Sequence, residues 1–338
     1  MHTRESGGLP TSRDVAARAG VSQPTVSRAL RGDPRVAPAT RARVQQAASE
    51  LRYVPSQRGR ALSTRRTGRV GVVVADLANP FYLQLLDLLQ AELAAQSLQM
   101  VVLTDEDREL VPGQLLDGSI DGAVLTTTLL DSSLSDALVR HGLPIVLLNR
   151  HNDSSTADVC AADNRGGGAL VGSELVALGH TRIGAIFGPA DTSTGRDRRR
   201  GFTDSLTDHG VQLSAELVRE GRFSFETGHE SLAGLMAADT PPTAIFCAND
   251  VIALGAMNAA HGLGIEIPRQ LTLIGFDDMA MAAWELFALT TVSQNMDQLA
   301  AHAVERLLRR IASPEGPAAR IKVRTELVRR ETHGPPLQ

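Results

Sequence analysis

The polar side chains of segment 22–30, Ser-Gln-Pro-Thr-Val-Ser-Arg-Ala-Leu, are the first in the chain whose types and spacing suggest a specific chemistry. At helical spacing Val26, Ala29 and Leu30 share one side, which leaves a polar opposite side: Gln23, Thr25, Ser27 and Arg28. An arginine can donate a bidentate pair of hydrogen bonds to guanine, and an amide can read adenine or guanine. Hydroxyl groups suit phosphates. The segment therefore predicts a surface that could bind nucleic acid.

The sequence patterns of common catalytic and metal sites are absent. Three consecutive glycines at 166–168 could hold a phosphate, but the P-loop lysine is missing, and no G-x-G-x-x-G motif follows a predicted strand. The G-x-S-x-G, H-E-x-x-H and paired-carboxylate patterns are missing too. Cys160 and Cys247 lack metal-ligand spacing, and we expect both to be buried. We therefore expect no enzymatic activity, no metal and no cofactor.

Charge is distributed unevenly along the 338 residues. Residues 1–66 contain thirteen arginines and four acidic residues, a net charge of +9, whereas the whole chain carries −4. The rest of the chain therefore carries −13. Such asymmetry indicates a nucleic-acid-binding end attached to a domain with another role. Because Lys322 is the single lysine of the chain, we interpret the sign of the charge and not the preference for arginine.

Three short helices are predicted to present the polar surface. The residues Thr-Ser-Arg-Asp at 11–14 fit a capping box that begins the first helix, and Gly20 ends it. Ser22 is suited to cap the second helix, Gln23 to Leu30. A third helix is expected from about Pro38 to Leu51. Two short helices joined by a tight glycine-containing turn and followed by a third are typical of a helix-turn-helix unit.

These elements resemble the DNA-binding domain of the LacI/GalR (lac repressor) family. The resemblance is carried by the run D-V-A-A-R-A-G-V-S-Q-P-T-V-S-R-A-L at 14–30 and extends over essentially the whole chain. It implies a helix-turn-helix domain over residues 9–55 that binds a pseudo-palindromic DNA operator as part of a homodimer, with the second helix in the major groove. The residues it implies for DNA contact are Gln23, Pro24 and Arg28 at base edges, and Ser22, Thr25 and Ser27 at phosphates.

Residues 56–68 resemble the hinge helix and linker of the same family. In relatives this helix orders on operator DNA, and a leucine inserts into the minor groove. Leu62 occupies that position here, and Arg60 is a further expected DNA contact. Gly59 stands where alanine is common, which should make the free hinge less helical by about 1 kcal/mol. A plain arginine-rich linker is the alternative.

From residue 69 onward, short apolar runs alternate with amphipathic segments such as the helix predicted from Phe81 to Ala95, which is the pattern of a doubly wound α/β fold. A first series of buried parallel strands is predicted at Val70–Ala75, Leu98–Leu103, Gly122–Leu125 and Ile145–Leu148. A second series is predicted at Ile183–Phe187, Leu217–Val218, Ala244–Ala248 and Leu271–Gly275. Two series indicate two similar lobes. Ligands of such folds lie beyond the carboxyl ends of the strands, so we expect a site in the cleft between the lobes.

Further motifs resemble the family's effector-binding domain, which is of periplasmic-binding-protein type. They include N-P-F-Y at 79–82, L-G-H at 178–180, A-N-D at 248–250 and I-G-F-D-D at 274–278. The resemblance implies an effector-binding domain over 69–338. Its first lobe spans about 69–163 and 295–325, and its second lobe spans about 164–294 and 326–331.

The same resemblance implies a set of effector-binding residues: Asn79, Phe81, Tyr82, Arg198, Phe223, Asn249 and Asp277. An arginine, a carboxylate and an aromatic face suit a polyol. A sugar is therefore expected, with a nucleobase or another metabolite, as effector or corepressor, as the alternative. Asn249 and Asp277 could instead simply cap helices.

The expected protein is a cytoplasmic repressor of sugar-utilisation genes. The first residues lack the apolar stretch of a signal peptide, and no run approaches the roughly 18 apolar residues of a membrane span. The basic N-terminal unit argues against a secreted solute-binding protein, whereas an effector-independent regulator stays open. The segment 105–120 is shorter than is usual for the family, and Pro112-Gly113 is expected to interrupt a helix there, which could alter the dimer interface.

Overall fold

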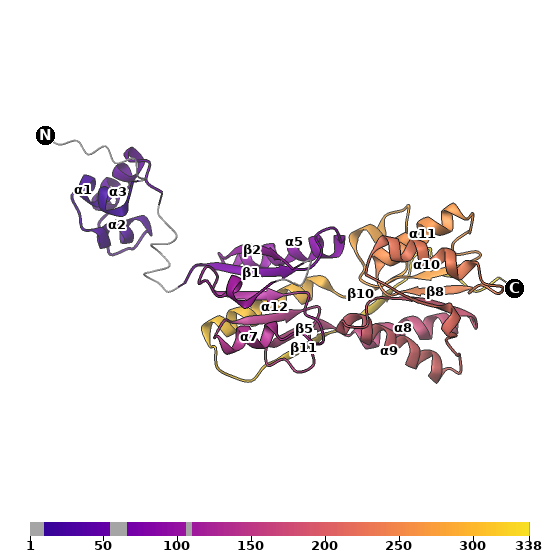
Figure 1. Ribbon diagram of the computed structural model, residues 1–338. Helices are drawn as coiled ribbons and strands as arrows, with labels where there is room; N and C mark the ends of the chain where they lie inside the picture. Colours follow the sequence, from indigo (N-terminus) through magenta and orange to yellow (C-terminus); the bar gives the residue numbers. More distant parts are fainter. Residues whose placement is uncertain (1–9, 55–65, 106–109, 338) are drawn as a thin grey trace. The chain divides into compact units, whose positions relative to one another are not determined.

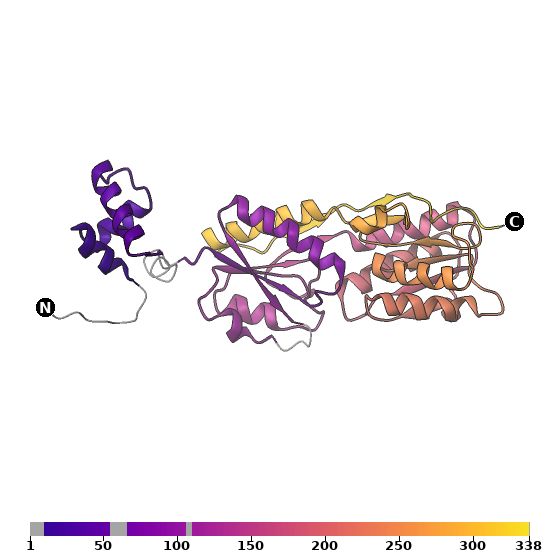
Figure 2. The same ribbon diagram turned by 90° about the horizontal axis from the view of Figure 1, so that it is seen from above.

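The computed structural model describes residues 10–54, 66–105 and 110–337. The chain forms two compact units, residues 1–67 and 68–338 (Figures 1 and 2). Arg60 and Leu62, which the hinge prediction names, lie outside the described residues. In the described part of the chain, no helix combines the length and the apolar character needed to cross a bilayer.

The first unit is a bundle of three helices, α1 (Ser12–Ala19), α2 (Gln23–Leu30) and α3 (Pro38–Glu50). The predicted capping box begins α1, and Gly20 ends it in the left-handed conformation that favours glycine. Ser22 caps α2 by accepting from the Thr25 backbone N–H. The buried core is made of small apolar side chains: Val15, Ala16, Ala19, Val26, Ala29, Val36, Val44, Ala47 and Ala48. All three predicted helices are confirmed, although Leu30 is only half-buried.

The second unit begins with a parallel six-stranded sheet in the order β11-β5-β4-β3-β1-β2. Its strands are β1 (Arg69–Val74), β2 (Gln99–Thr104), β3 (Gly122–Leu125), β4 (Ile145–Leu148), β5 (Asp158–Ala162) and β11 (Arg320–Val323). Helices α5 (Pro80–Ala95) and α12 (Met296–Ala312) lie side by side and share one apolar cluster with the sheet (Figure 2). Helices α6 (Pro112–Leu115) and α7 (Leu134–Arg140) contribute to the other cluster. The sheet is therefore covered on both faces, as a doubly wound fold requires.

Two expectations for this lobe are wrong. The strand predicted at Leu98–Leu103 is present as β2, but it is an edge strand whose residues are half-buried or exposed, because it has a neighbour on one side only. Pro112 does not interrupt a helix. It begins α6, where a proline loses no hydrogen bond.

The second lobe contains a parallel four-stranded sheet in the order β7-β6-β8-β9. Its strands are β6 (Ile183–Phe187), β7 (Val218–Glu220), β8 (Ala244–Cys247) and β9 (Thr272–Ile274). Helices α8 (Asn164–Ala177) and α9 (Ser193–Asp208) pack on one face, and α10 (Phe225–Met236) and α11 (Asp250–Gly262) pack on the other. The strand predicted at Leu217–Val218 differs: Leu217 ends the 3-10 turn η1 (Ala215–Leu217), and β7 is a half-exposed edge strand.

Short elements link the lobes. Strands β10 (Thr291–Ser293) and β12 (Glu326–Val328) pair antiparallel, and η2 (Ala280–Ala283) is a second 3-10 turn. The chain passes from one lobe to the other after β5, after β10 and after β11. These three crossings place the carboxyl ends of strands from both sheets near one another.

The glycine-rich start of α8 has a packing role. A Cβ atom at Gly168 would lie 2.2 Å from the backbone oxygen of Arg198, and one at Gly201 would lie 1.9 Å from the backbone oxygen of Arg165. Both distances are far below van der Waals contact, so α8 and α9 can approach this closely only with glycine at these positions. Gly168 and Gly201 therefore seat α9, and with it Arg198, against α8.

Candidate functional site

The surface of α2 presents the residues that the sequence singles out. Ser22, Gln23, Pro24, Ser27 and Arg28 are exposed, and Thr25 is half-buried. The Ser22 and Thr25 hydroxyls lie 2.8 Å apart, and Gln23 Nε2 donates to Ser12 Oγ at 2.8 Å. Within the described residues, the guanidinium group of Arg28 makes no hydrogen bond or ion pair, so its donors are available to a partner.

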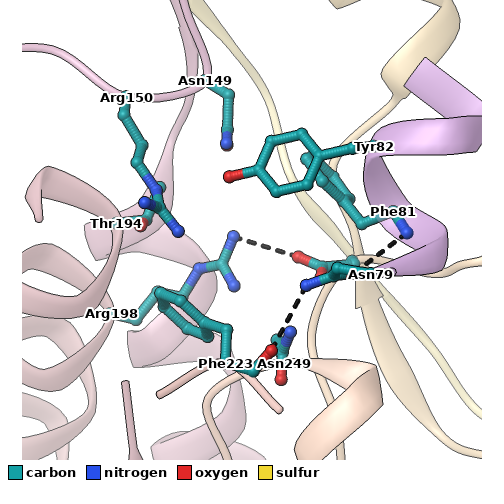
Figure 3. A pocket seen from close by; sticks show the side chains of 10 residues that line it. Asn79, Phe81, Tyr82, Asn149, Arg150, Thr194, Arg198, Phe223 and Asn249 are labelled. Carbon is teal, nitrogen blue, oxygen red and sulfur yellow. Dashed lines mark hydrogen bonds and ion pairs between the residues drawn. The ribbon is translucent and has the colours of Figure 1, made fainter. Parts of the chain in front are cut away.

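A small pocket in the second unit has a cavity volume of about 20 Å³ (Figure 3). Its walls come from both lobes and include all seven residues predicted to bind effector: Asn79, Phe81, Tyr82, Arg198, Phe223, Asn249 and Asp277. Three further lining residues were not predicted: Asn149, Arg150 and Thr194. We call this space the inner pocket.

The first lobe contributes the start of α5. Asn79 caps this helix by accepting from the Phe81 backbone N–H at 3.0 Å, and its amide nitrogen donates to the Phe223 backbone oxygen at 3.3 Å. The hydrogen bond from Asn79 to Phe223 joins the two lobes beside the pocket. The rings of Phe81 and Tyr82 pack edge to face at 5.3 Å. Burial raises the pKa of Tyr82, so its hydroxyl stays protonated and can donate or accept.

Arg198 is almost completely buried and is held from several sides. Its Nε donates to Asn164 Oδ1 at 2.9 Å, and Nη1 donates to the Ala248 backbone oxygen at 2.7 Å. Its Nη2 forms an ion pair with Asp277 Oδ1 at 3.0 Å. The guanidinium lies over the Phe276 ring, 3.8 Å from the centroid. These contacts fix the orientation of the Arg198 guanidinium group in the absence of a ligand.

Asp277 is the acceptor of this pair and is equally buried. Burial raises the pKa of its carboxyl to about 6, and the charge of Arg198 and a hydrogen bond from Gln294 Nε2 at 2.5 Å oppose that rise. Asp277 also has a positive φ of 126°, a conformation rare outside glycine. A non-glycine residue in this conformation beside a pocket is typical of a functional position.

A second carboxyl, Asp250, lies behind this pair. It accepts from Thr291 Oγ1 at 2.5 Å and from the Met279 backbone N–H at 2.9 Å. Burial and then the charge of Asp277 raise its pKa well above the usual value.

Asn249 performs the structural role that the sequence left open. It caps α11, with Oδ1 accepting from the Ile252 backbone N–H at 2.9 Å. Its amide nitrogen has no partner among the described residues, although the side chain lines the inner pocket. The cap therefore orients a free donor toward the pocket. Asp277, in contrast, does not cap a described helix.

The residues that sequence reasoning missed follow β4 and begin α9. Asn149 has a φ of 68°, and its Oδ1 is buried without a partner in the described part of the chain. The Nε of Arg150 is also buried without a partner, and its guanidinium lies 5.3 Å from the Phe223 ring centroid. Thr194 lies in the first turn of α9. The rule that ligands lie beyond the carboxyl ends of strands could have located Asn149 and Arg150.

A larger hollow of about 790 Å³, which we call the outer cleft, adjoins the inner pocket. The two share Asn79, Tyr82, Arg150 and Phe223. The outer cleft carries further charged residues at its walls: Asp76, Asp105, Asp191, Glu220 and Arg222. A ligand in the inner pocket could therefore extend into a wider polar space.

The described residues contain no group of three or more histidine, cysteine, aspartate or glutamate side chains placed to hold a metal ion. The expectation of buried cysteines is confirmed for Cys160 and Cys247. Burial raises the pKa of Cys160 to about 12, so this thiol remains protonated and is a poor nucleophile.

Two family descriptions match the chain. Residues 11–56 match "Bacterial regulatory proteins, lacI family", and residues 173–333 match "Periplasmic binding protein-like domain". These matches cover α1 to α3 and most of the second lobe.

Full-length relatives and solved structures agree with them. The transcriptional repressor PurR of Pasteurella multocida is 31% identical over 329 residues, which cover 96% of this chain and 98% of that protein. The regulator CelR of Thermobifida fusca is also 31% identical, over 336 residues, with 96% and 98% covered.

Among solved structures, a CelR–cellobiose complex matches with 30% identity and a TM-score of 0.73, covering 96% of this chain and 99% of that one. The lac repressor dimer bound to operator and the anti-inducer ONPF matches with 27% identity and a TM-score of 0.86, with the same coverage. These relatives are transcriptional regulators and not enzymes. The chain belongs to the LacI family and is a DNA-binding transcriptional regulator.

Proposed function

We propose that this regulator is a homodimeric repressor whose affinity for a pseudo-palindromic operator is set by a small polar effector in the inner pocket. One observation carries the proposal. The seven residues predicted to bind effector come from segments as far apart as Asn79 and Asp277, yet all of them line the same pocket. Residues with convergent polar groups around a small cavity are the usual form of a ligand site.

On the DNA side, we propose that α2 enters the major groove. Arg28 and Gln23 would contact base edges, Pro24 would make an apolar contact, and Ser22, Thr25 and Ser27 would position the helix on phosphates. The exposure of this face and the unpaired guanidinium of Arg28 support the assignment. Arg60 and Leu62 are proposed as further contacts from the hinge segment.

On the effector side, we propose a sugar. The buried Arg198–Asp277 pair supplies a donor and an acceptor for hydroxyl groups, and the rings of Phe81, Tyr82 and Phe223 supply apolar faces. The inner pocket has a volume of only about 20 Å³, far below the roughly 300–1,000 Å³ typical of ligand pockets, so a sugar ring would also occupy part of the adjoining outer cleft of about 790 Å³. The related CelR structure contains cellobiose, so sugars occur in a relative of this similarity. Genes of sugar utilisation are the proposed targets, and the cytoplasm is the proposed place of action.

The coupling of the two sites follows from the position of the pocket. Effector contacts from both lobes would change how the lobes close, and the hydrogen bond from Asn79 to Phe223 already joins them. A change at α5 in the first lobe would then alter how paired hinge segments meet the operator. Coupling of this kind is typically 1–3 kcal/mol.

The test is a fluorescence-anisotropy titration of the full-length protein with the palindrome upstream of its own gene, repeated over a salt series. Tight binding with a steep salt dependence is expected. Equal affinity for a scrambled duplex would contradict the DNA-binding assignment. A thermal-shift screen of monosaccharides, disaccharides and nucleobases tests the effector class separately, since a ligand of the native state raises its apparent stability. A response to nucleobases alone would reject the sugar.

A further inference from the structure

The charged groups of the inner pocket do not balance. Its lining contains two arginines, Arg150 and Arg198, and one carboxylate, Asp277. Arg198 and Asp277 compensate each other at 3.0 Å. Asp250, the next carboxyl, does not line this pocket, and burial and the charge of Asp277 raise its pKa. One positive charge, that of Arg150, is left over in the inner pocket.

Arg150 has no ion-pair partner among the described residues. Its side chain is half-buried, its Nε is buried without a hydrogen bond, and its guanidinium is 5.3 Å from the Phe223 ring. The guanidinium of Arg198 is 5.9 Å from the same ring, so both cations lie close to one phenyl group. Figure 3 shows the two arginine side chains on the same side of the pocket, opposite Tyr82.

The acidic residues of the outer cleft make other contacts, although the backbone hydrogen bonds of Asp76 and Asp105 leave the charges of these two carboxylates in place. Asp76 accepts from the Ala78 backbone N–H at 2.9 Å, and Asp105 accepts from that of Leu110 at 3.0 Å. Glu220 pairs with Arg199 at 2.9 Å. Asp191 is also engaged in an interaction of its own. None of them forms an ion pair with Arg150 within the described structure.

An uncompensated cation in a half-buried site is unfavourable, and proteins usually hold such a charge next to an opposite one. Among residues 66–105 and 110–337, no carboxylate forms an ion pair with Arg150. The unpaired Oδ1 of Asn149, next to Arg150 in sequence, is an acceptor that a hydroxyl or a protonated acid could reach. Together these groups form a recognition site for an anion on a hydroxylated molecule.

We propose that the effector is a sugar acid, whose carboxylate binds Arg150 while its hydroxyls bind Arg198 and Asp277. The inference rests on the proposed sugar-binding function and narrows it. A carboxylate carries a single charge and matches the single unbalanced cation, whereas a phosphate ester carries about −1.5 to −2 at neutral pH. The planar guanidinium group of Arg150 can also donate two parallel hydrogen bonds to the two oxygens of a carboxylate.

Isothermal titration of the full-length protein with matched pairs tests the proposal: D-glucuronate against D-glucose, D-galacturonate against D-galactose, and D-glucose 6-phosphate as the dianionic arm. At least one acid should bind about tenfold or more tightly than its neutral partner, as expected for a charge-assisted hydrogen bond. In Arg150→Met, which keeps an apolar stem against Phe223, this preference should disappear. Arg150→Lys keeps the positive charge but loses the bidentate guanidinium group, so the preference for the acid should be partly retained.

Arg200→Met is the matched control. Arg200 is an exposed arginine on the same helix as Arg198, and it lines neither hollow, so its removal should leave the preference within about twofold. Arg150→Met should also melt no lower than the wild type without ligand, since it removes an uncompensated cation.

Equal or tighter binding of the neutral sugars would overturn the sugar acid and leave the proposed sugar-binding function in place. If glucose 6-phosphate binds more tightly than either acid, the proposal that the anionic group of the effector is a carboxylate is wrong. If no sugar and no acid binds, both this inference and the proposed sugar effector are wrong. Operator binding, measured by anisotropy, would still report separately on the DNA-binding part of the proposal.

Discussion

At the scale of single residues, Asp277 is a proposed effector contact whose ionisation also affects stability. Its folded-state pKa of about 6 lies above the ordinary value of 3.8, so the folded state holds the proton more tightly than the unfolded state does. The resulting stabilisation is fully present below about pH 4 and is lost as the pH rises through 6. Burial disfavours the ionised form of this carboxyl, and a protein is expected to retain such a group where it binds a ligand.

Asp277→Asn should therefore weaken effector binding about tenfold or more, because the charged acceptor is lost. Its stability relative to the wild type should rise as the pH increases from 4 to 7. Melting temperatures of both proteins across this range, with isothermal titration at pH 7, check the two effects. A difference in melting temperature that does not change with pH would contradict the raised pKa.

Arg28 is the residue for which we predict base specificity. Arg28→Ala should cost about 1–3 kcal/mol on the preferred operator and relax the preference at one base pair, because a bidentate contact discriminates by that amount. Anisotropy with a set of single-base operator variants measures it. Arg43→Ala, an exposed arginine on α3, serves as the control and should change affinity for all sequences alike. A uniform loss in Arg28→Ala would instead indicate a phosphate contact.

At the scale of elements, the close approach of α8 and α9 should be sensitive to a single methyl group. Gly201→Ala places a Cβ 1.9 Å from a backbone oxygen, so we expect a loss of about 1–3 kcal/mol or more in the free energy of unfolding. Gly262→Ala, at the end of α11 with no atom within 4 Å of a Cβ, should be neutral or slightly stabilising. Urea denaturation of both variants checks the contrast. Equal effects would mean that the helices can separate without cost.

A second prediction at this scale concerns the contact between His180 and the segment that follows β12, which includes Gly334. His180 is buried, with Nε2 donating to the Gly334 backbone oxygen and Nδ1 hydrogen-bonded to Thr243 Oγ1, both at 2.8 Å. Burial lowers the pKa of His180, so the stability that it contributes is present above about 6.5 and is lost as the pH falls below that value. His180→Asn should remove part of the loss in melting temperature between pH 7 and 5. The exposed His261→Asn should leave the loss unchanged; a similar effect in both variants would contradict the assignment.

The elements that sequence patterns predicted well are those whose apolar runs are buried on both faces. The limits of β3, β4 and β6 agree with prediction to the residue. Strand β5 was missed because its sequence, Asp-Val-Cys-Ala-Ala, begins with a charge. In the fold Arg306 and Arg310 of α12 pair with Asp158 at 3.1 and 2.9 Å, about 150 residues away in sequence. No local pattern reveals such compensation.

The same limit applies to the pocket. The family resemblance locates Arg198 and Asp277 as separate residues, but their ion pair joins positions 79 residues apart and depends on the seating of α9 by glycines. Arg150 has no motif of its own. Its proposed role follows from the lack of an ion-pair partner among the described residues, and that can be judged only once the surrounding side chains are placed.

At the scale of the whole molecule, the two units carry opposite net charges, +9 in residues 1–66 and −13 in the remainder. The basic unit provides electrostatic affinity for any DNA, and its salt dependence should reflect the number of phosphates contacted. The acidic unit adds no affinity of this kind. If an effector controls DNA binding as proposed, we expect it to act through conformation.

Conformational control makes a quantitative prediction. If binding of effector and operator is linked, then the factor by which saturating effector changes operator affinity must equal the factor by which operator changes effector affinity, and a factor of about 5–150 is typical. Anisotropy with and without the tightest ligand of the sugar and sugar-acid panel gives the first factor. Isothermal titration with and without operator duplex gives the second.

The sign of the effect, release or promotion of DNA binding, must also agree in the two measurements. Asp277→Asn should require far more ligand to show the same effect, while its operator affinity without ligand stays unchanged, because Asp277 lies in the pocket and the proposed DNA contacts lie in the other unit. A factor of one in both directions with the wild type would mean that the pocket is occupied without consequence for DNA. The protein would then be an effector-independent regulator.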